Sequence, residues 1–135
     1  MDSLTVSAKI ESLDTVYKFV NEKLTSLNCE ERTLYQLRLA IEEIFVNIAS
    51  YAYHPKDGEA EVRCEVLEAP LRVVIQFLDS GTPFDPLAAE DADTSPEGLF
   101  GREGGLGILL VKNVMDDVQY TYENGKNILT ILKKL

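Results

Sequence analysis

The sequence lacks the features of membrane-spanning, secreted and disulfide-bonded proteins. No apolar run approaches the ~18 residues that a bilayer-crossing helix needs, and no basic segment followed by an apolar one opens the chain. Only two cysteines occur among 135 residues, too few for a disulfide framework. We therefore expect a cytoplasmic protein without a membrane partner, folded as a single domain over residues 1–135.

Positive charge is also scarce. Lys and Arg number 13 against 23 Asp and Glu, which gives a formal net charge of -10. A field of this sign repels nucleic acid and anionic lipid, so neither is an expected partner, whereas a basic protein surface would be attracted. Any anionic ligand must then be held by local positive features, such as a metal ion, a helix N-terminus or a few cations.

Side chains with metal-binding or nucleophilic chemistry are few and scattered. Cys29 is expected where a helix starts and Cys64 within a strand, and neither has a Cys or His at metal-ligand spacing. We interpret both as buried thiols. The single histidine, His54, precedes Pro55 in an expected turn and has no second ligand or nucleophile near it, so it receives no chemical role.

Hydrophobic periodicity predicts strands and helices in the first half of the chain. Alternating apolar residues over 4–8 indicate a short strand at a sheet edge. Apolar residues at three- and four-residue steps then predict helices over 13–27 and 28–48. Asn28 and Glu31 have the spacing of a capping box, which predicts the start of the second helix.

The second half predicts more strands and one more helix. Alternation indicates adjacent strands at 59–65 and 71–78, and a later hairpin turning at Asn124-Gly125. A helix is expected over 105–115, whereas 83–104 has no sustained period and is interpreted as a long loop or lid with a short helical piece. The fold class is therefore α+β, a mixed and mostly antiparallel sheet with helices on one face.

A carboxylate and an amide share one face of the second helix. Glu43 and Asn47 lie four residues apart and off the centre of the apolar stripe. The amide oxygen of Asn47 is a hard, neutral ligand that suits Mg²⁺, and the Glu43 carboxylate can accept a proton from an attacking hydroxyl. The alternative interpretation is a solvated helix flank, because such pairs are common on exposed helices.

Two further clusters contain the chemistry of a nucleotide site. Asp79 follows directly on an apolar strand, where its carboxylate can accept hydrogen bonds from an exocyclic amine, and Gly81 would let a flat ring approach the backbone. The alternative is a strand-terminating turn. Residues 102–107 place glycines at a helix start, which offers N–H groups and a positive dipole end to phosphate. Their spacing matches neither a P-loop nor a Rossmann fingerprint, and the alternative is a flexible hinge.

Taken together, these motifs resemble the N, G1 and G2 boxes of the GHKL (Bergerat-fold) ATPases. The residues that carry the resemblance lie at 43–53, 79–86 and 105–116, and the flanking elements extend it over nearly the whole chain. The closer similarity is to the anti-sigma-factor serine kinases of bacterial partner-switching systems. The resemblance implies a two-layer α/β sandwich, the histidine-kinase-like ATPase fold.

The resemblance also implies roles for single residues. Glu43 matches the general base, Asn47 the Mg²⁺ ligand of bound ATP, and Asp79 the carboxylate that reads adenine. Residues 86–104 match the ATP lid. The nucleotide-binding loop is assigned Gly81, Gly104, Gly105, Leu106 and Gly107.

One further assignment and two departures from the family pattern complete this comparison. Arg102 is assigned as a phosphate contact, with a surface salt bridge to acidic residues of the lid as its alternative. Tyr51 stands where relatives often have His. Asn127-Ile128 stands where many have Gly-Thr near the adenine, which we expect to loosen the adenine contacts.

The function implied by the resemblance is that of an ATP- and Mg²⁺-dependent anti-sigma factor. Such a protein binds a sigma factor and phosphorylates a serine or threonine on a STAS-domain antagonist, and so regulates transcription, for example in a stress response. We expect a homodimer held through the sheet side of the domain. The alternatives are an ATP-binding module of the same fold that sequesters a partner without kinase activity, and an interaction domain that binds no nucleotide.

Overall fold

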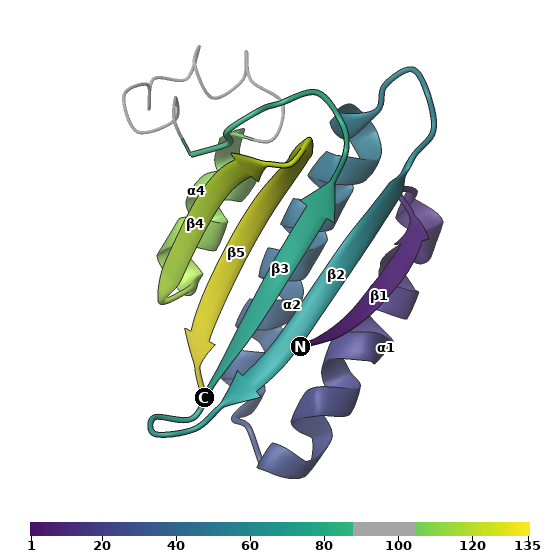
Figure 1. The fold of residues 1–135 in the computed structure, drawn as a ribbon. Helices are drawn as coiled ribbons and strands as arrows, with labels where there is room; N and C mark the ends of the chain where they lie inside the picture. The colour runs from purple at the N-terminus through teal and green to yellow at the C-terminus, as the bar shows by residue number, and fades with distance from the viewer. Residues whose placement is uncertain (88–104) are drawn as a thin grey trace.

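A five-stranded antiparallel sheet forms one layer of the molecule, and helices cover one of its faces (Figure 1). The computed structural model describes residues 1–87 and 105–135. The strand order is β1-β2-β3-β5-β4, and each neighbouring pair is antiparallel. The strands are β1 (Asp2–Ser7), β2 (Glu59–Leu67), β3 (Arg72–Asp79), β4 (Asp117–Glu123) and β5 (Lys126–Lys134). The expected α+β fold is confirmed, without a parallel pair among the described strands.

The three α-helices of the described residues form the second layer. They are α1 (Leu13–Leu24), α2 (Glu31–Asn47) and α4 (Gly105–Val114). Helix α2 continues into a π-helical segment, η3 (Ile48–Ala52), and α1 is bounded by the 3₁₀ turns η1 (Ile10–Ser12) and η2 (Thr25–Leu27). Figure 1 shows all three helices behind the same face of the sheet. Helix α2 packs against α4, which brings two of the predicted motifs side by side.

The core lies between the sheet and this helical layer. Alternate residues of the central strands point into it, among them Val62, Ile75 and Ile131, each at most 1% exposed. Helices α1 and α2 contribute Val16 and Phe45 to the same core, and these side chains have no exposed surface. Full burial of such a side chain is worth about 1.5–3 kcal/mol, so this seam holds the helices against the sheet.

The predicted capping box is wrong. Helix α2 begins at Glu31 after Glu30, which makes no side-chain capping hydrogen bond. Asn28 instead ends η2 with a left-handed φ of 56°. Asparagine tolerates this conformation better than most residues, so Asn28 terminates one helix and does not start the next. Cys29, expected to be buried, is half-exposed, whereas Cys64 is buried in β2 as expected.

The turn between β4 and β5 confirms the sequence prediction. Asn124 and Gly125 have φ values of 54° and 76°. A type I′ hairpin turn requires positive φ at both of its central residues, and this dipeptide is suited to it. The turn places β5 between β3 and β4, next to the residues that follow the end of β3.

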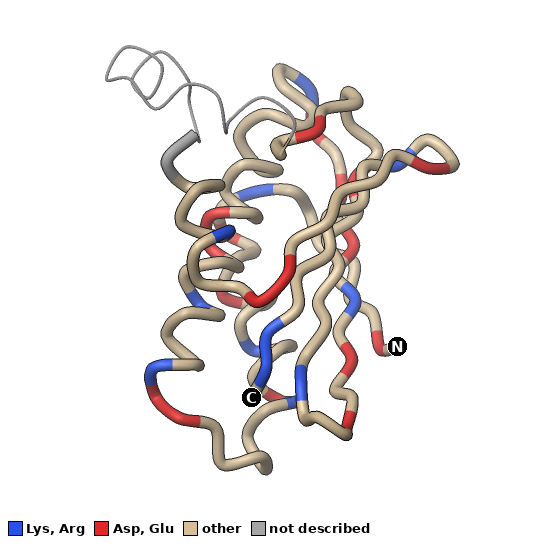
Figure 2. Tube along the Cα trace, turned by 90° about the vertical axis from the view of Figure 1, so that its left-hand side faces the viewer, with Lys and Arg blue, Asp and Glu red and all other residues tan. Residues whose placement is uncertain are grey.

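Charged residues of both signs are interspersed along the described chain (Figure 2). No described helix has the length and apolar character to cross a membrane.

Candidate nucleotide-binding site

A cavity of about 490 Å³ opens among α2, η3, the end of β3 and the C-terminal hairpin. Its walls are mostly apolar, and a few polar side chains point into it. The apolar residues include Ile44, Ile48, Phe77, Ile108 and Leu129, and the polar ones include Asn47, Asp79, Thr82 and Asn127. Apolar walls with a few convergent polar groups are typical of small-ligand sites. The cavity unites Asn47 and Asp79, which are separate motifs in the sequence.

Asp79 presents a fixed hydrogen-bond acceptor to this cavity. It is the last residue of β3 and is only 7% exposed. Its Oδ1 accepts hydrogen bonds from the Gly81 backbone N–H at 2.9 Å and from Asn127 Nδ2 at 3.0 Å. Its Oδ2 receives no hydrogen bond within the described chain. Every fully buried side-chain oxygen in that part of the chain has a partner, so Oδ2 is not fully buried. Oδ2 is therefore the oxygen that a ligand can reach.

The loop after Asp79 is fastened to the end of the helical layer. The Thr82 N–H donates to the Ala52 carbonyl at 3.1 Å. A Cβ at Gly81 would overlap that same carbonyl, so this position needs glycine for contact between two backbone segments. The Tyr53 hydroxyl adds a second link, because it accepts from the Ser80 N–H at 2.8 Å and donates to the Glu59 carbonyl at 2.5 Å.

Glu43 lies against the first turn of α4. A Cβ built at Gly107 would overlap Glu43 Oε2, so the absence of a side chain at Gly107 makes room for the carboxylate. Glu43 and Asn47 are both half-buried. No hydrogen bond or ion pair within the described chain occupies either side chain. Neither residue is therefore on a fully solvated flank. Asn47 lines the cavity, whereas Glu43 lies one helical turn away from it.

The remaining predicted residues are placed only in part. Gly105 begins α4, and Leu106 is in its first turn, as the glycine motif predicts for the start of a helix. Arg102, Gly104 and nearly all of the predicted lid at 86–104 lie outside the described residues.

Asn127 was expected near the adenine as a departure from the family pattern, but its contact with Asp79 was not predicted. It is 8% exposed, and its Nδ2 also donates to the Thr82 carbonyl at 3.0 Å. Its Oδ1 accepts from the Phe84 N–H at 3.1 Å and from the Tyr120 hydroxyl. Desolvation by burial raises the pKa of Tyr120, which keeps this phenol a donor at neutral pH. One signal was available in the sequence. Asn127 is a polar residue at a position that alternates with the buried Leu129 and Ile131, so it points to the same face of the strand.

Asn47 is the described side chain best suited to a metal-bound phosphate. The described residues contain no group of three or more His, Cys, Asp or Glu side chains able to hold a metal ion. A Mg²⁺ that arrives with a nucleotide takes most of its ligands from phosphate oxygens and water, so one amide oxygen from the protein fits its needs.

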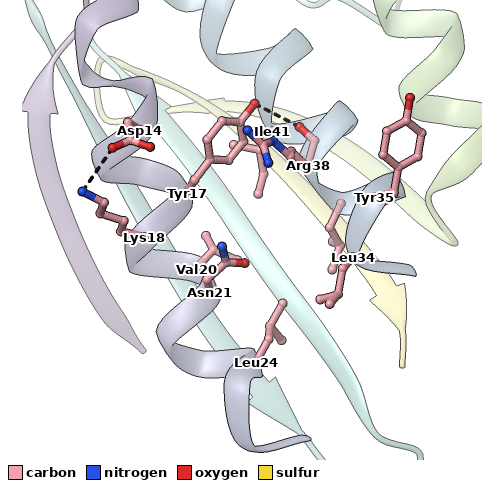
Figure 3. A pocket seen from close by; sticks show the side chains of 11 residues that line it. Asp14, Tyr17, Lys18, Val20, Asn21, Leu24, Leu34, Tyr35, Arg38 and Ile41 are labelled. Atoms are coloured by element: carbon pink, nitrogen blue, oxygen red, sulfur yellow. Dashed lines mark hydrogen bonds and ion pairs between the residues drawn. The ribbon is translucent and has the colours of Figure 1, made fainter. Parts of the chain in front are cut away.

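A second cavity, of about 320 Å³, lies between α1 and α2 (Figure 3). The Arg38 guanidinium stacks over the Tyr17 ring at 4.8 Å, and the Tyr17 hydroxyl donates to the Arg38 carbonyl at 3.4 Å. Lys18 and Asp14 form an exposed pair at 3.2 Å. None of the described candidate residues lines this hollow, so the 490 Å³ cavity is the candidate site.

The arrangement is that of a Bergerat-type domain, with a cavity between the helical layer and the ends of the central strands. A family model described as "Histidine kinase-like ATPase domain" matches residues 6–133. The chain therefore belongs to the histidine kinase-like ATPase domain family.

Two similar proteins carry the name serine-protein kinase. Serine-protein kinase RsbW of Listeria innocua serovar 6a is 31% identical over 99 residues, which cover 69% of this chain and 61% of that protein. Serine-protein kinase RsbW of Staphylococcus aureus (strain bovine RF122) is 32% identical over 99 residues, covering 67% of this chain and 60% of that protein. The chain thus matches about three fifths of the length of each relative.

Solved structures share the fold. The RsbU and RsbW domains of Rv1364c from Mycobacterium tuberculosis align with a TM-score of 0.67 at 15% identity, covering 100% of this chain and 33% of that one. Acinetobacter baumannii histidine kinase AdeS aligns with a TM-score of 0.52 at 14% identity, covering 99% and 68%. At these identities the likeness concerns the fold alone.

Proposed function

We propose that this chain is a protein serine/threonine kinase that uses ATP with Mg²⁺. The observation that carries the proposal is the single cavity that joins an acceptor carboxylate, Asp79, to a free amide, Asn47, one helical turn from Glu43. The apolar walls of the cavity would enclose the adenine ring of ATP, and Asp79 Oδ2 would accept a hydrogen bond from the exocyclic amine of that ring.

The phosphate end of the site lies toward α4. Asn47 would supply an amide oxygen to Mg²⁺, and the start of α4 would offer its N–H groups and positive dipole end to the phosphates. This local positive potential is needed because the chain carries a net charge of -10. Arg102, Gly104 and Leu106 remain assigned to the nucleotide, and residues 86–104 to a lid.

Glu43 would act as the general base. The serine or threonine hydroxyl of the protein substrate attacks the γ-phosphorus, and its proton passes to the Glu43 carboxylate. A new P–O bond forms as the bond to the β-phosphate oxygen breaks, so the products are a phosphoprotein and ADP. Gly107 supports this role because it lets the carboxylate lie beside the helix start.

The proposed partners are a sigma factor and a STAS-domain antagonist, with the antagonist as the phosphorylated protein. Support comes from the resemblance of the motifs to anti-sigma-factor kinases and from the two relatives named serine-protein kinase RsbW. The acidic net charge favours basic surfaces on a partner. We propose a cytoplasmic homodimer.

Substitution of the proposed general base, Glu43, tests the proposal. Glu43→Gln keeps the size of the side chain but cannot accept the proton, so ATP should still bind while phosphoryl transfer falls by ~10²-fold or more. The measurement combines calorimetry with Mg-ATP and mass spectrometry of STAS-domain proteins for a gain of one phosphate. Glu42→Gln is the matched control, because Glu42 is the preceding residue and is exposed.

Three outcomes are distinct. If Glu43→Gln transfers phosphate at the parent rate, Glu43 is not the base. If the parent binds ATP and a sigma factor but phosphorylates no STAS-domain protein, the chain is a sequestering module. If the parent binds no nucleotide, the cavity has another role.

A further inference from the structure

Asp79 and Asn127 are the two buried polar residues in the described part of the chain, and they contact each other. Asn127 comes from β5, whereas Asp79 ends the neighbouring strand β3. Buried polar groups are stable only when their hydrogen bonds are made, so the partners of this pair are informative.

The Asn127 amide has no hydrogen-bonding capacity left over. It has two N–H donors and an oxygen with two lone pairs. The donors go to Asp79 Oδ1 and the Thr82 carbonyl, each at 3.0 Å, with a longer contact of 3.4 Å to the Gly81 carbonyl. The oxygen accepts from the Phe84 N–H and the Tyr120 hydroxyl. A flipped amide would place oxygen against oxygen, so this orientation is fixed.

The backbone beside Asp79 has also used its donors. The Gly81 N–H is bound to Asp79 Oδ1, the Thr82 N–H to the Ala52 carbonyl, and the Ser80 N–H to the Tyr53 hydroxyl. Pro83 has no N–H. Besides the rotatable hydroxyl of Thr82, which can donate or accept, the group that this edge of the cavity offers to a ligand is an acceptor, Asp79 Oδ2.

We infer that Asn127 is a positioning residue that makes the cavity select a nucleobase with an exocyclic amine over a 6-oxo purine, an inference that rests on the proposed function. It holds Asp79 by Oδ1 and accepts a hydrogen bond from the Phe84 N–H. An amine can donate to Oδ2. A 6-oxo group would instead set its oxygen against the carboxylate, and a polar atom buried without a partner is penalised strongly.

The test compares ATP with ITP, which carries a carbonyl in place of the amine. Calorimetry on the full chain with Mg²⁺ should show that the parent prefers ATP by about 10- to 100-fold, as expected for one hydrogen bond to a charged group. In Asn127→Ala the preference should fall toward equality, because Asp79 Oδ1 loses one of the two hydrogen bonds that hold it and keeps only the Gly81 N–H. Asn124→Gly, in the exposed turn of the same hairpin, is the control and should keep the parent preference.

Asn127→Asp extends the test with a side chain of the same shape. The introduced carboxyl group can donate to Asp79 Oδ1, as the amide does, only while it is protonated, and once ionised it repels the Asp79 carboxylate. The preference of this variant for ATP should therefore weaken, relative to the parent at each pH, as the pH rises.

The failures are separable. A parent that binds neither nucleotide ends both the proposed function and this inference. A parent that binds ATP and ITP equally overturns the inference alone. The same holds if Asn127→Ala lowers both affinities by one factor, or if Asn127→Asp keeps the parent preference at every pH.

Discussion

At the scale of single residues, the contact between Glu43 and Gly107 joins two motifs that are 64 positions apart, as their residue numbers show. The carboxylate occupies the space where any other residue would place its Cβ. Helix formation alone favours alanine over glycine by about 1 kcal/mol, so the choice of glycine here follows from this contact and not from local propensity.

Gly107→Ala should therefore impair catalysis more than folding. The added methyl group would displace the Glu43 carboxylate, while the gain in helix propensity offsets part of the strain. We expect slower phosphoryl transfer with a nearly unchanged melting temperature, measured by mass spectrometry and calorimetry. In the double variant with Glu43→Gln the two losses should not add, because both act through one carboxylate. Additive losses would show that Gly107 acts by another route.

The two cysteines should differ in reactivity. Burial raises the pKa of the Cys64 thiol from its ordinary 9.0 to about 11, whereas Cys29 is half-exposed. A thiol reagent in native buffer should label Cys29 first and Cys64 only at the rate of unfolding, as peptide mass mapping can show. Since unfolded Cys64 ionises at lower pH than folded Cys64, its contribution to stability should be lost as the pH rises from 9.0 toward about 11. Rapid native labelling of Cys64 would contradict its burial.

At the scale of elements, long periodic segments were predictable. Helix α2 and strands β2 and β3 have unbroken apolar patterns, and the Asn124-Gly125 pair has few conformational options besides the turn observed. In each case local pattern and tertiary packing favour the same structure, so the sequence is sufficient.

Element ends were less predictable. Asn28 suits both a helix cap and a left-handed helix end, and the spacing to Glu31 favoured the first. Which of the two conformations Asn28 adopts depends on how the chain must turn from α1 into α2. This is a tertiary constraint, and the residues around Asn28 do not encode it.

The candidate site was half predictable. Glu43, Asn47 and Asp79 were predicted from their chemistry together with the family resemblance, and the structure places Asn47 and Asp79 on one cavity. Asn127 was interpreted as a departure that loosens adenine contacts, yet it holds the Asp79 carboxylate from a strand 48 positions away. A hydrogen bond between distant strands depends on register, which single-residue patterns do not encode.

At the scale of the whole molecule, no helix of the described residues lies over the second face of the sheet (Figure 1). Val74, Ile128 and Leu132 alternate with core residues and therefore point to this face, where each is half-buried. These apolar side chains lie beside polar ones on the same face, among them Gln76 and Thr130, which are hydrogen-bonded to each other. A mixed face of this kind, which the described chain leaves without a helical cover, is suited to pairing with a second copy.

We expect a homodimer formed through this face. Light scattering at micromolar concentration should give twice the 15.1 kDa mass of the chain. Leu132→Lys should yield a monomer that still binds ATP, because the charge opposes burial of the face but lies on the side away from the cavity. Ile10→Lys, at an exposed apolar residue outside the sheet, should leave the dimer intact. A parent that is strictly monomeric would refute the expectation.

The position of β5 has a consequence for how the protein is made. β5 is the last described strand to be synthesised, yet it lies between β3 and β4. A chain growing on the ribosome therefore holds an open edge on β3 and an unpaired β4 until β5 emerges, and such edges are templates for aggregation. Until then Asp79 also lacks the hydrogen bond from the Asn127 amide. The cavity is therefore complete only after β5 has paired. A nucleotide that binds there would stabilise the sheet with β5 in place, and it could bind only once the sheet has been synthesised.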